Sequence, residues 1–133
     1  MSHKNSNSDR SKNGNSFEKT FTNLTGINKI RKKDKPRFTN IHGNEQIIDF
    51  DFYTEINGVK IYVDVSTTFR SDRLKQKSYN ALMMKNKISN DCKFYMVVKS
   101  LTENGKKKKP NLIEGIDDVY EIDEFIGILN QLR

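Results

Sequence analysis

The sequence contains a single cysteine, two histidines and no apolar run long enough to cross a membrane. One cysteine, Cys92, excludes an internal disulfide and is typical of a protein in a reducing cytosol. A membrane-spanning helix needs about 20 apolar residues, and the N-terminus has no apolar core of a signal peptide. We therefore expect a cytoplasmic protein with no membrane contact.

Several catalytic patterns are absent as well. The chain has no glycine-rich phosphate loop and no group of Cys and His residues with zinc-binding spacing. It also shows no Ser-His or Cys-His pairing of the kind that activates a nucleophile. With so few histidines, chemistry that depends on a histidine base is not favoured.

The 133 residues are enough for one hydrophobic core but not for two. Residues 1–15 are rich in Ser, Asn, Lys and Gly, which predicts a disordered polar and basic tail. Residues 16–133 then form a single domain. The net charge of +7 favours a polyanionic partner such as nucleic acid, although basic charge also serves solubility.

The chain is organised around residues 47–72, IIDFDFYTEINGVKIYVDVSTTFRSD. Asn57-Gly58 predicts a type I′ hairpin turn, because both residue types tolerate positive φ. Counting outward from this turn predicts the register of the two strands. One face, expected to be buried, pairs Ile56 with Val59, Thr54 with Ile61, Phe52 with Val63 and Phe50 with Val65. The other face pairs Glu55 with Lys60, Tyr53 with Tyr62, Asp51 with Asp64 and Asp49 with Ser66.

Asp51 and Asp64 face each other in this register. Like charges directly opposite each other in a sheet repel, unless a positive group lies between them, and a divalent cation is the usual candidate. The pair therefore indicates a metal site. The alternative is a solvated acidic face in a slightly different register.

The flanking segments predict an α/β fold. Phe17, Phe21 and Leu24 lie on one face of a helix expected over 16–30, which Gly26 can end. A short strand is expected over 38–41, a helix over 71–87, a buried central strand over 93–99 and a last strand over 119–122, followed by a C-terminal helix. A helix between two such strands predicts a right-handed parallel crossover.

A carboxylate in one strand, a hairpin, the tetrapeptide Val63-Asp64-Val65-Ser66 and a following helix together resemble the PD-(D/E)XK nucleases, which include restriction endonucleases. Asp51 matches the first carboxylate of the motif and Asp64 the second, whereas Ser66 stands where the family usually has lysine. The resemblance covers residues 16–133 by element order. It implies a restriction endonuclease-like core, with a central mixed β-sheet of four to five strands flanked by helices in the order α-β-β-β-α-β.

The resemblance also implies roles for several residues. Asp51 and Asp64, with the Val65 carbonyl, would hold Mg²⁺. Asp49 is a further metal ligand, and Glu18 matches a helix glutamate that can join the metal site or simply interact with the helix dipole. In some members the catalytic cation moves onto the following helix, where Lys75 or Lys77 would supply it. Ser66 would hydrogen-bond the attacking water or a phosphate oxygen.

Three basic segments are candidates for contact with DNA phosphates. They contain Arg70 and Arg73 at the start of the 71–87 helix, Lys32 and Lys33 in the run KIRKKDKPR, and Lys107 and Lys108 among four consecutive lysines. Each segment also has an explanation without DNA. The start of the 71–87 helix can be a solvated helix face, KIRKKDKPR a solvated linker, and the four lysines part of a loop.

Three functions fit these observations. The first is a Mg²⁺-dependent endonuclease of the restriction type, which cuts double-stranded DNA as a cleavage subunit beside a larger DNA-recognising partner, as in heterodimeric type IIS enzymes. The second is a Holliday-junction resolvase, which needs a homodimer. The third is a catalytically silent DNA-binding or assembly subunit, which Ser66 favours. The paired Asp51 and Asp64 favour the first two, and we rank the restriction-type nuclease first.

Overall fold

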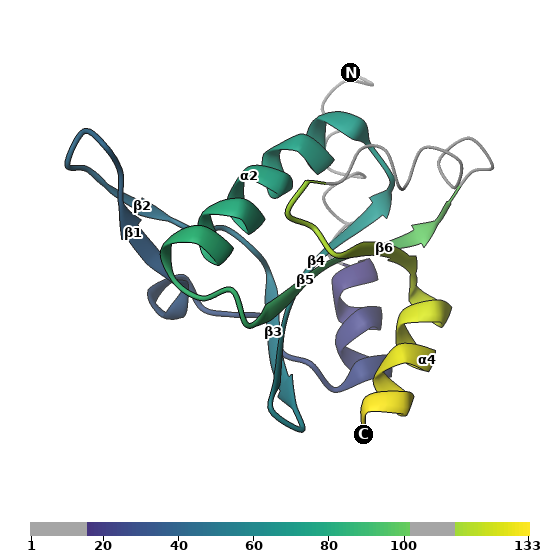
Figure 1. Ribbon diagram of the computed structural model, residues 1–133. Coiled ribbons are helices and arrows are strands. Elements are labelled where there is room, and N and C mark those ends of the chain that lie inside the picture. The colour runs from purple at the N-terminus through teal and green to yellow at the C-terminus, as the bar shows by residue number, and fades with distance from the viewer. Residues whose placement is uncertain (1–15, 102–113) are drawn as a thin grey trace, which may run out of the picture.

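The computed structural model describes residues 16–101 and 114–133 (Figure 1). The predicted tail at 1–15 and the candidates Lys107 and Lys108 lie outside the described residues. A helix occupies residues 16–25. It is followed in chain order by η1 (Lys32–Asp34), β1 (Arg37–Thr39), β2 (Glu45–Ile47), β3 (Phe52–Ile56), β4 (Val59–Thr68), α2 (Ser71–Lys87), β5 (Cys92–Ser100), β6 (Asp118–Glu121) and α4 (Ile122–Leu132).

Four of these strands form the central sheet, in the order β3-β4-β5-β6. β3 is antiparallel to β4, whereas β4, β5 and β6 run parallel, which confirms the predicted mixed α/β architecture. The parallel pair of β4 and β5 is joined through α2, and β5 is an interior strand, both as predicted. The strand expected over 38–41 belongs instead to a separate two-stranded ribbon, in which β1 pairs antiparallel with β2.

The predicted hairpin register is confirmed over the whole of β3. Every pair from Ile56–Val59 to Phe52–Val63 forms as counted from the turn. Asn57 and Gly58 have φ values of +51° and +82°, which a type I′ turn requires and which most other residue types resist.

The chain leaves this ladder at Asp51, and here the prediction was wrong. The Asp51 main-chain oxygen accepts a hydrogen bond of 2.7 Å from the Ile30 amide, and Lys29 bridges to Phe52. Because the backbone turns to meet residues 29 and 30, Phe50 packs on the opposite face from Phe52, with its ring 4.4 Å from that of Tyr62. The expected strand pairs Asp51–Asp64, Asp49–Ser66 and Phe50–Val65 are therefore absent.

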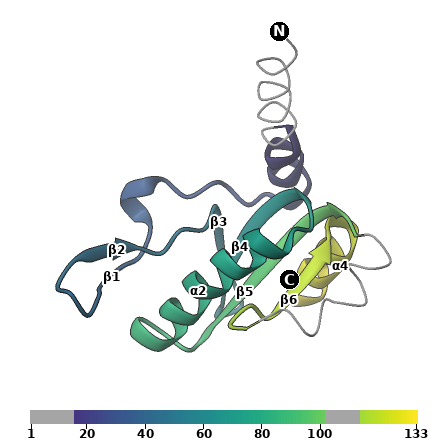
Figure 2. The same ribbon diagram turned by 90° about the horizontal axis from the view of Figure 1, so that it is seen from above.

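The two faces of the sheet are covered by different helices (Figure 2). α2 lies over one face, and helix 16–25 together with α4 lies over the other. Alternate residues of β4 serve the two layers, since successive strand side chains point to opposite faces. Val63 and Val65 join the apolar cluster of helix 16–25 and α4, whereas Tyr62 and Asp64 face α2.

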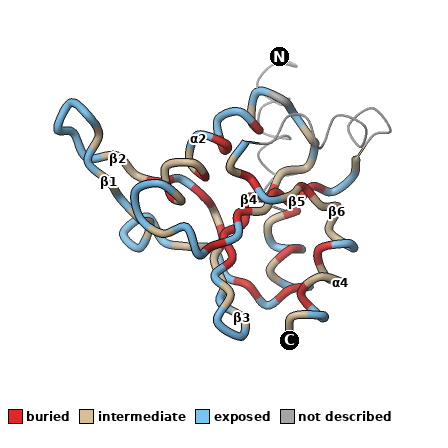
Figure 3. Tube along the Cα trace, in the orientation of Figure 1, coloured by how far each residue is buried: buried red, intermediate tan, exposed pale blue. Residues whose placement is uncertain are grey.

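The buried positions follow β4 and β5 through the middle of the molecule (Figure 3). The layer under α2 is built largely from Ile48, Phe50, Tyr62, Leu74, Ala81, Met84, Phe94, Met96 and Val98. The opposite layer contains Phe17, Phe21, Ile27, Phe52, Ile61, Val63, Val65, Val97, Phe125 and Leu129. No helix within 16–101 or 114–133 has the length and apolar character that a membrane crossing requires.

Candidate active site

The centre of the candidate site is Asp64, in the part of β4 that lies under α2. Its side chain is 0 % exposed, yet two cations of α2 reach it. Arg73 Nη2 lies 3.1 Å from Asp64 Oδ2, and Lys77 Nζ lies 3.4 Å from Oδ1. Arg73 and Lys77 are four residues apart, so they share one face of the helix and approach the carboxylate together.

The pairing continues away from the sheet. Lys77 Nζ donates a hydrogen bond of 3.2 Å to the Asp49 main-chain oxygen and lies 3.7 Å from Asp49 Oδ2. Asp49 Oδ1 in turn binds Lys35 Nζ at 2.6 Å. We call the series Lys35–Asp49–Lys77–Asp64–Arg73 the charge chain. It ties the loop after η1, the segment before β3, strand β4 and helix α2 to one another.

Burial dominates the electrostatics of Asp64 despite its two cationic neighbours. The pKa of the Asp64 carboxyl is raised to about 7, chiefly by the loss of water on burial. Asp51 contributes to this rise through charge and hydrogen bonding, while Lys77 and Arg73 oppose it. Asp64 Oδ1 has no hydrogen-bond partner. The other acid of the charge chain behaves in the opposite way, because the hydrogen bond from Lys35 lowers the pKa of Asp49.

Asp51 lies close to Asp64, as the sequence predicted, but for a different reason. Strand pairing does not hold Asp51 in place, because β3 begins at Phe52. Its position depends on the hydrogen bond between its main-chain oxygen and the Ile30 amide. The two carboxyl groups are near enough for Asp51 to raise the pKa of Asp64.

A hollow of about 720 Å³ opens at Val65, the residue that follows Asp64. It is lined by Val65, Ser66, Thr67 and Thr68 of β4, by Glu18 of helix 16–25, and by Arg70 and Arg73. The hollow exists because β4 continues to Thr68 although its pairing with β3 stops at Val63. Arg73 both lines the hollow and binds Asp64, so it connects the space to the buried carboxylate.

The main chain of Val65 is directed toward the same space. A two-residue hairpin turn is closed by a hydrogen-bonded pair, and such pairs alternate along an antiparallel ladder. The main-chain groups of Val59, Ile61 and Val63 therefore face β3. By the same period of two, those of Val65 face that side beyond the end of β3, which leaves its carbonyl available to a ligand.

The predicted site residues divide into those at Asp64 and those elsewhere. Of the two helix lysines, Lys77 lies at Asp64, whereas Lys75 is exposed and has no described contact with the site. Arg73, predicted as a DNA contact, binds Asp64, while Arg70 pairs with Asp72 at 2.9 Å.

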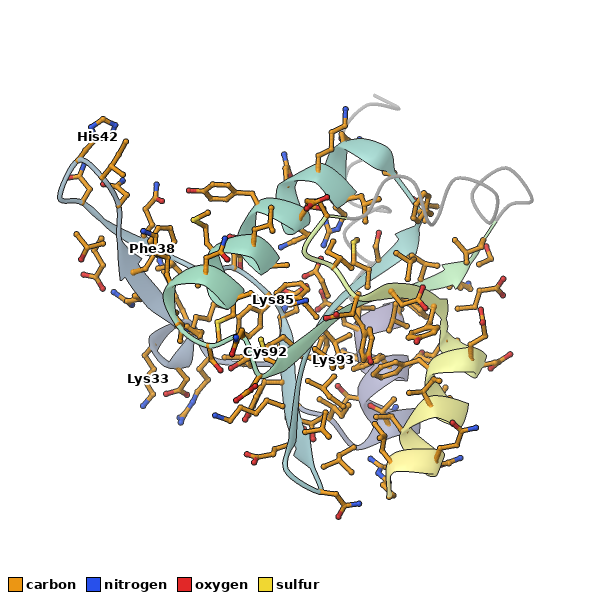
Figure 4. All side chains as sticks on the ribbon, in the orientation of Figure 1. Lys33, Phe38, His42, Lys85, Cys92 and Lys93 are labelled. Carbon is orange, nitrogen blue, oxygen red and sulfur yellow. The ribbon has the colours of Figure 1, made fainter. Side chains whose placement is uncertain are left out.

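The remaining candidates are also accounted for. Glu18 lines the hollow but binds Lys29 at 2.9 Å. Ser66 lines the hollow, and its hydroxyl donates a hydrogen bond of 2.9 Å to the Thr68 main-chain oxygen. Lys32 and Lys33 lie on η1, away from Asp64, and Lys33 points outward in Figure 4.

Sequence reasoning did not find Lys35 or its bond to Asp49. No local pattern connects two residues 14 positions apart, so this pair could not have been read from the sequence. The choice of Lys77 over Lys75 did have a signal. Lys77 is three residues after Leu74 and four before Ala81, both of which are buried, so helical periodicity directs Lys77 toward the sheet.

The donor set at Asp64 fits a hard cation in part. No group of three or more Asp, Glu, His or Cys side chains is placed to hold a metal among the residues that the structure describes. Asp49 and Glu18, predicted as ligands, instead bind lysines. Two neighbouring carboxyl groups and the Val65 carbonyl remain, and the buried Asp64 Oδ1 accepts no hydrogen bond although Lys77 Nζ lies 3.4 Å from it. This set fits Mg²⁺, which is typically held by one or two carboxylates and keeps several waters.

Comparison with protein-family models, with curated proteins and with solved structures found no match to this chain. Function is therefore inferred from the geometry of the site.

Proposed function

We propose that this chain is a Mg²⁺-dependent DNA endonuclease of the PD-(D/E)XK type, in which Lys77 of α2 replaces the lysine usual at position 66. The observation that carries the proposal is the fully buried Asp64, which has Asp51 beside it and Lys77 Nζ 3.4 Å from Oδ1. Buried charges are costly, and perturbed carboxyl groups cluster at functional sites. The element order also supports a restriction endonuclease-like core, since a helix precedes the β3–β4 hairpin and α2 connects β4 to β5.

The proposed reaction is hydrolysis of a phosphodiester. A water loses a proton to solvent as its oxygen bonds to phosphorus, the bond from phosphorus to a sugar oxygen breaks, and the leaving oxygen takes up a proton from solvent. Asp51 and Asp64, with the Val65 carbonyl, would hold Mg²⁺, which when bound lowers the pKa of its water and neutralises charge on the phosphate. Lys77 and Arg73 add positive charge where the transition state gains negative charge.

Arg73 also suits substrate binding. Its side chain lines the hollow, where Ser66, Thr67 and Thr68 offer main-chain and hydroxyl groups to a phosphate. Double-stranded DNA is the proposed substrate, because the net charge is +7 and phosphates dominate the affinity of DNA-binding proteins. A homodimer or a larger recognition subunit would complete a restriction-type enzyme.

A second candidate function is a DNA-binding subunit that does not cut. It is favoured by the two cations already paired with Asp64 and by Ser66 in place of a strand lysine. In that case the charge chain serves only to join the loop after η1, the segment before β3, strand β4 and helix α2.

The test is cleavage of supercoiled plasmid and of a four-way junction by the purified chain, in Mg²⁺ and in EDTA. We expect cutting in Mg²⁺ only, and its loss in Asp64→Asn. Asp72→Asn is the matched control, because Asp72 is exposed and pairs with Arg70 away from Asp64. Preference for the junction would assign a resolvase. Binding of both DNAs without cutting would overturn the nuclease in favour of the silent subunit.

A further inference from the structure

The strands β1 and β2 and the turn between them form an arm that projects from the body of the molecule (Figures 1 and 2). We call residues 37–47 the ribbon arm. It is attached at its base, where Phe38 packs against the core under α2 and Tyr79 Oη hydrogen-bonds Gln46 Oε1 at 3.2 Å. None of the residues placed at Asp64 belongs to it.

The tip of the ribbon arm is a closed, hydrogen-bonded turn. The Asn40 amide donates to the Asn44 main-chain oxygen at 2.8 Å, and the Gly43 amide donates to that of Asn40 at 3.0 Å. The Asn40 side chain adds two bonds, since its Oδ1 accepts from the His42 and Asn44 amides at 2.9 and 3.0 Å. Gly43 has φ of +81°, which glycine adopts without strain. The turn therefore holds its side chains in defined positions.

This turn presents Ile41 to solvent. Ile41 is 90 % exposed, whereas Leu24, the next most exposed large apolar side chain within 16–101 and 114–133, is 53 % exposed. His42 lies beside it at the end of the arm (Figure 4). Single exposed apolar residues are common on protein surfaces. Here, however, a structured projection carries the residue, so Ile41 can enter a concave partner without rearrangement.

The charge around the arm indicates the partner. Six cations against two acids give residues 29–47 a net charge of +4, out of +7 for the whole chain. The cations are Lys29, Arg31, Lys32, Lys33, Lys35 and Arg37, and the acids are Asp34 and Glu45. The tip itself, residues 38–44, contains no acid. Four of these cations are ion-paired with Glu18, Asp34, Asp49 and Glu45, which leaves Lys32 and Lys33 of η1 to meet a partner. Two lysines that precede a neutral tip complement a polyanion whose groove displays neutral base edges.

We propose that the ribbon arm inserts into the major groove of double-stranded DNA, with Ile41 against the bases and the η1 lysines on the phosphate backbone. The major groove, about 12 Å wide, admits a two-stranded β-ribbon, and apolar side chains contact the methyl group of thymine there. Lys32 and Lys33 are exposed on η1, which precedes the arm directly. The inference rests on the proposed function only in taking DNA as the partner.

The test measures binding without cutting, by fluorescence anisotropy of an AT-rich duplex in EDTA. We expect Ile41→Ser to weaken binding about 5-fold and Leu24→Ser, the matched control on helix 16–25, to bind as the wild type does. A duplex with uracil in place of thymine lacks the methyl groups. The wild type should bind it more weakly than the thymine duplex, whereas Ile41→Ser should bind the two equally.

The lysines are tested by the salt dependence of the same measurement. Loss of two phosphate contacts in the double variant Lys32→Gln/Lys33→Gln should lower the slope of log affinity against log salt by about 2. The control is the double variant Lys87→Gln/Lys93→Gln, which removes two exposed lysines, one at the end of α2 and one near the start of β5.

Three results would overturn the inference. In the first, Ile41→Ser binds DNA as tightly as the wild type and still distinguishes thymine from uracil. In the second, the η1 variant has the same dependence of affinity on salt as the wild type, and in the third, the wild type is a dimer that Ile41→Ser dissociates. The last result would assign the arm to a second copy of the chain. If the ribbon arm is required for DNA binding but the protein never cuts DNA, the nuclease proposal is wrong and the DNA-binding role of the arm stays supported. If the protein cuts DNA and changes in the arm affect neither binding nor cutting, the role of the arm is wrong and the nuclease proposal stays supported.

Discussion

Helix 16–25 and α4 cover their face of the sheet with a cluster of aromatic and aliphatic side chains, whereas α2 covers the other face with a core that also encloses Asp64, Lys77 and Ser78. Both faces are buried, so stability alone would be served by apolar residues on each. Replacing a buried ion pair by well-packed apolar residues is often neutral or stabilising. Stability alone therefore does not explain the charges under α2, whereas the function that we propose would, and the apolar face supplies the stability that offsets their cost.

The largest expected effect lies on the apolar face. Phe52 is 1 % exposed, and its ring centroid is 4.7 Å from that of Phe21. We expect Phe52→Ala to lower the free energy of unfolding by about 3–5 kcal/mol, measured by urea denaturation. Because Phe52 faces away from α2, cleavage per folded molecule should not change. A loss below about 1 kcal/mol would show that this face does not supply the stability, and a folded variant that has lost cleavage would show that the reaction also depends on it.

The second effect concerns pH and the face under α2. The pKa of Asp64, about 7, lies above its unfolded value near 3.8, so the folded state binds the proton more tightly. The contribution of Asp64 to stability is then fully present below about pH 4 and is lost as pH rises toward 7.

This dependence is measured as the difference in unfolding free energy between the wild type and Asp64→Asn, in EDTA at pH 5 and pH 8. Other titrating groups cancel in that difference. The wild type should lose on the order of 2 kcal/mol relative to the variant between the two pH values. A difference that stays constant, or one that grows with pH, would contradict the burial of an ionisable Asp64.

The smallest effect is on metal affinity. Arg73 Nη2 lies on Asp64 Oδ2, so the guanidinium competes with any cation for that carboxylate. Arg73→Gln should tighten Mn²⁺ binding about 5- to 10-fold, or about 1 kcal/mol, in calorimetry without DNA. Arg70→Gln is the control, because Arg70 lines the same hollow but binds Asp72. Equal affinities in the two variants would argue against a metal at Asp64.

The same comparison explains what the sequence could predict. The Asn57-Gly58 turn determines the register locally, so counting outward was sufficient from Ile56 to Phe52. The prediction stopped being correct at Asp51, where the backbone bonds to Ile30, about twenty residues earlier in the chain. Contacts between distant segments leave no periodic signal, and for this reason the opposite placement of Phe50 was not foreseen.

The sequence likewise predicted only part of the candidate site. Asp51 and Asp64 were expected together, and they do lie near each other, although the loop and not the strand ladder places Asp51. The prediction left Lys75 and Lys77 open, although helical periodicity could have separated them, and the structure shows that Lys77 Nζ reaches Asp64. The bonds of Asp49 to Lys35 and of Glu18 to Lys29 depend on tertiary structure, so their roles could not be assigned from sequence.

Plasmid cleavage in Mg²⁺ by Lys77→Met beside Lys75→Met tests most directly whether Lys77 is a catalytic cation. Both variants lose one lysine of α2, but only Lys77 contacts Asp64. Asp64 can take up a proton when its partner is removed, so circular dichroism should show a folded Lys77→Met. We predict that Lys77→Met cuts about 10²- to 10³-fold more slowly and that Lys75→Met cuts at the wild-type rate. Equal rates in the two variants, or a wild type that does not cut, would contradict the account.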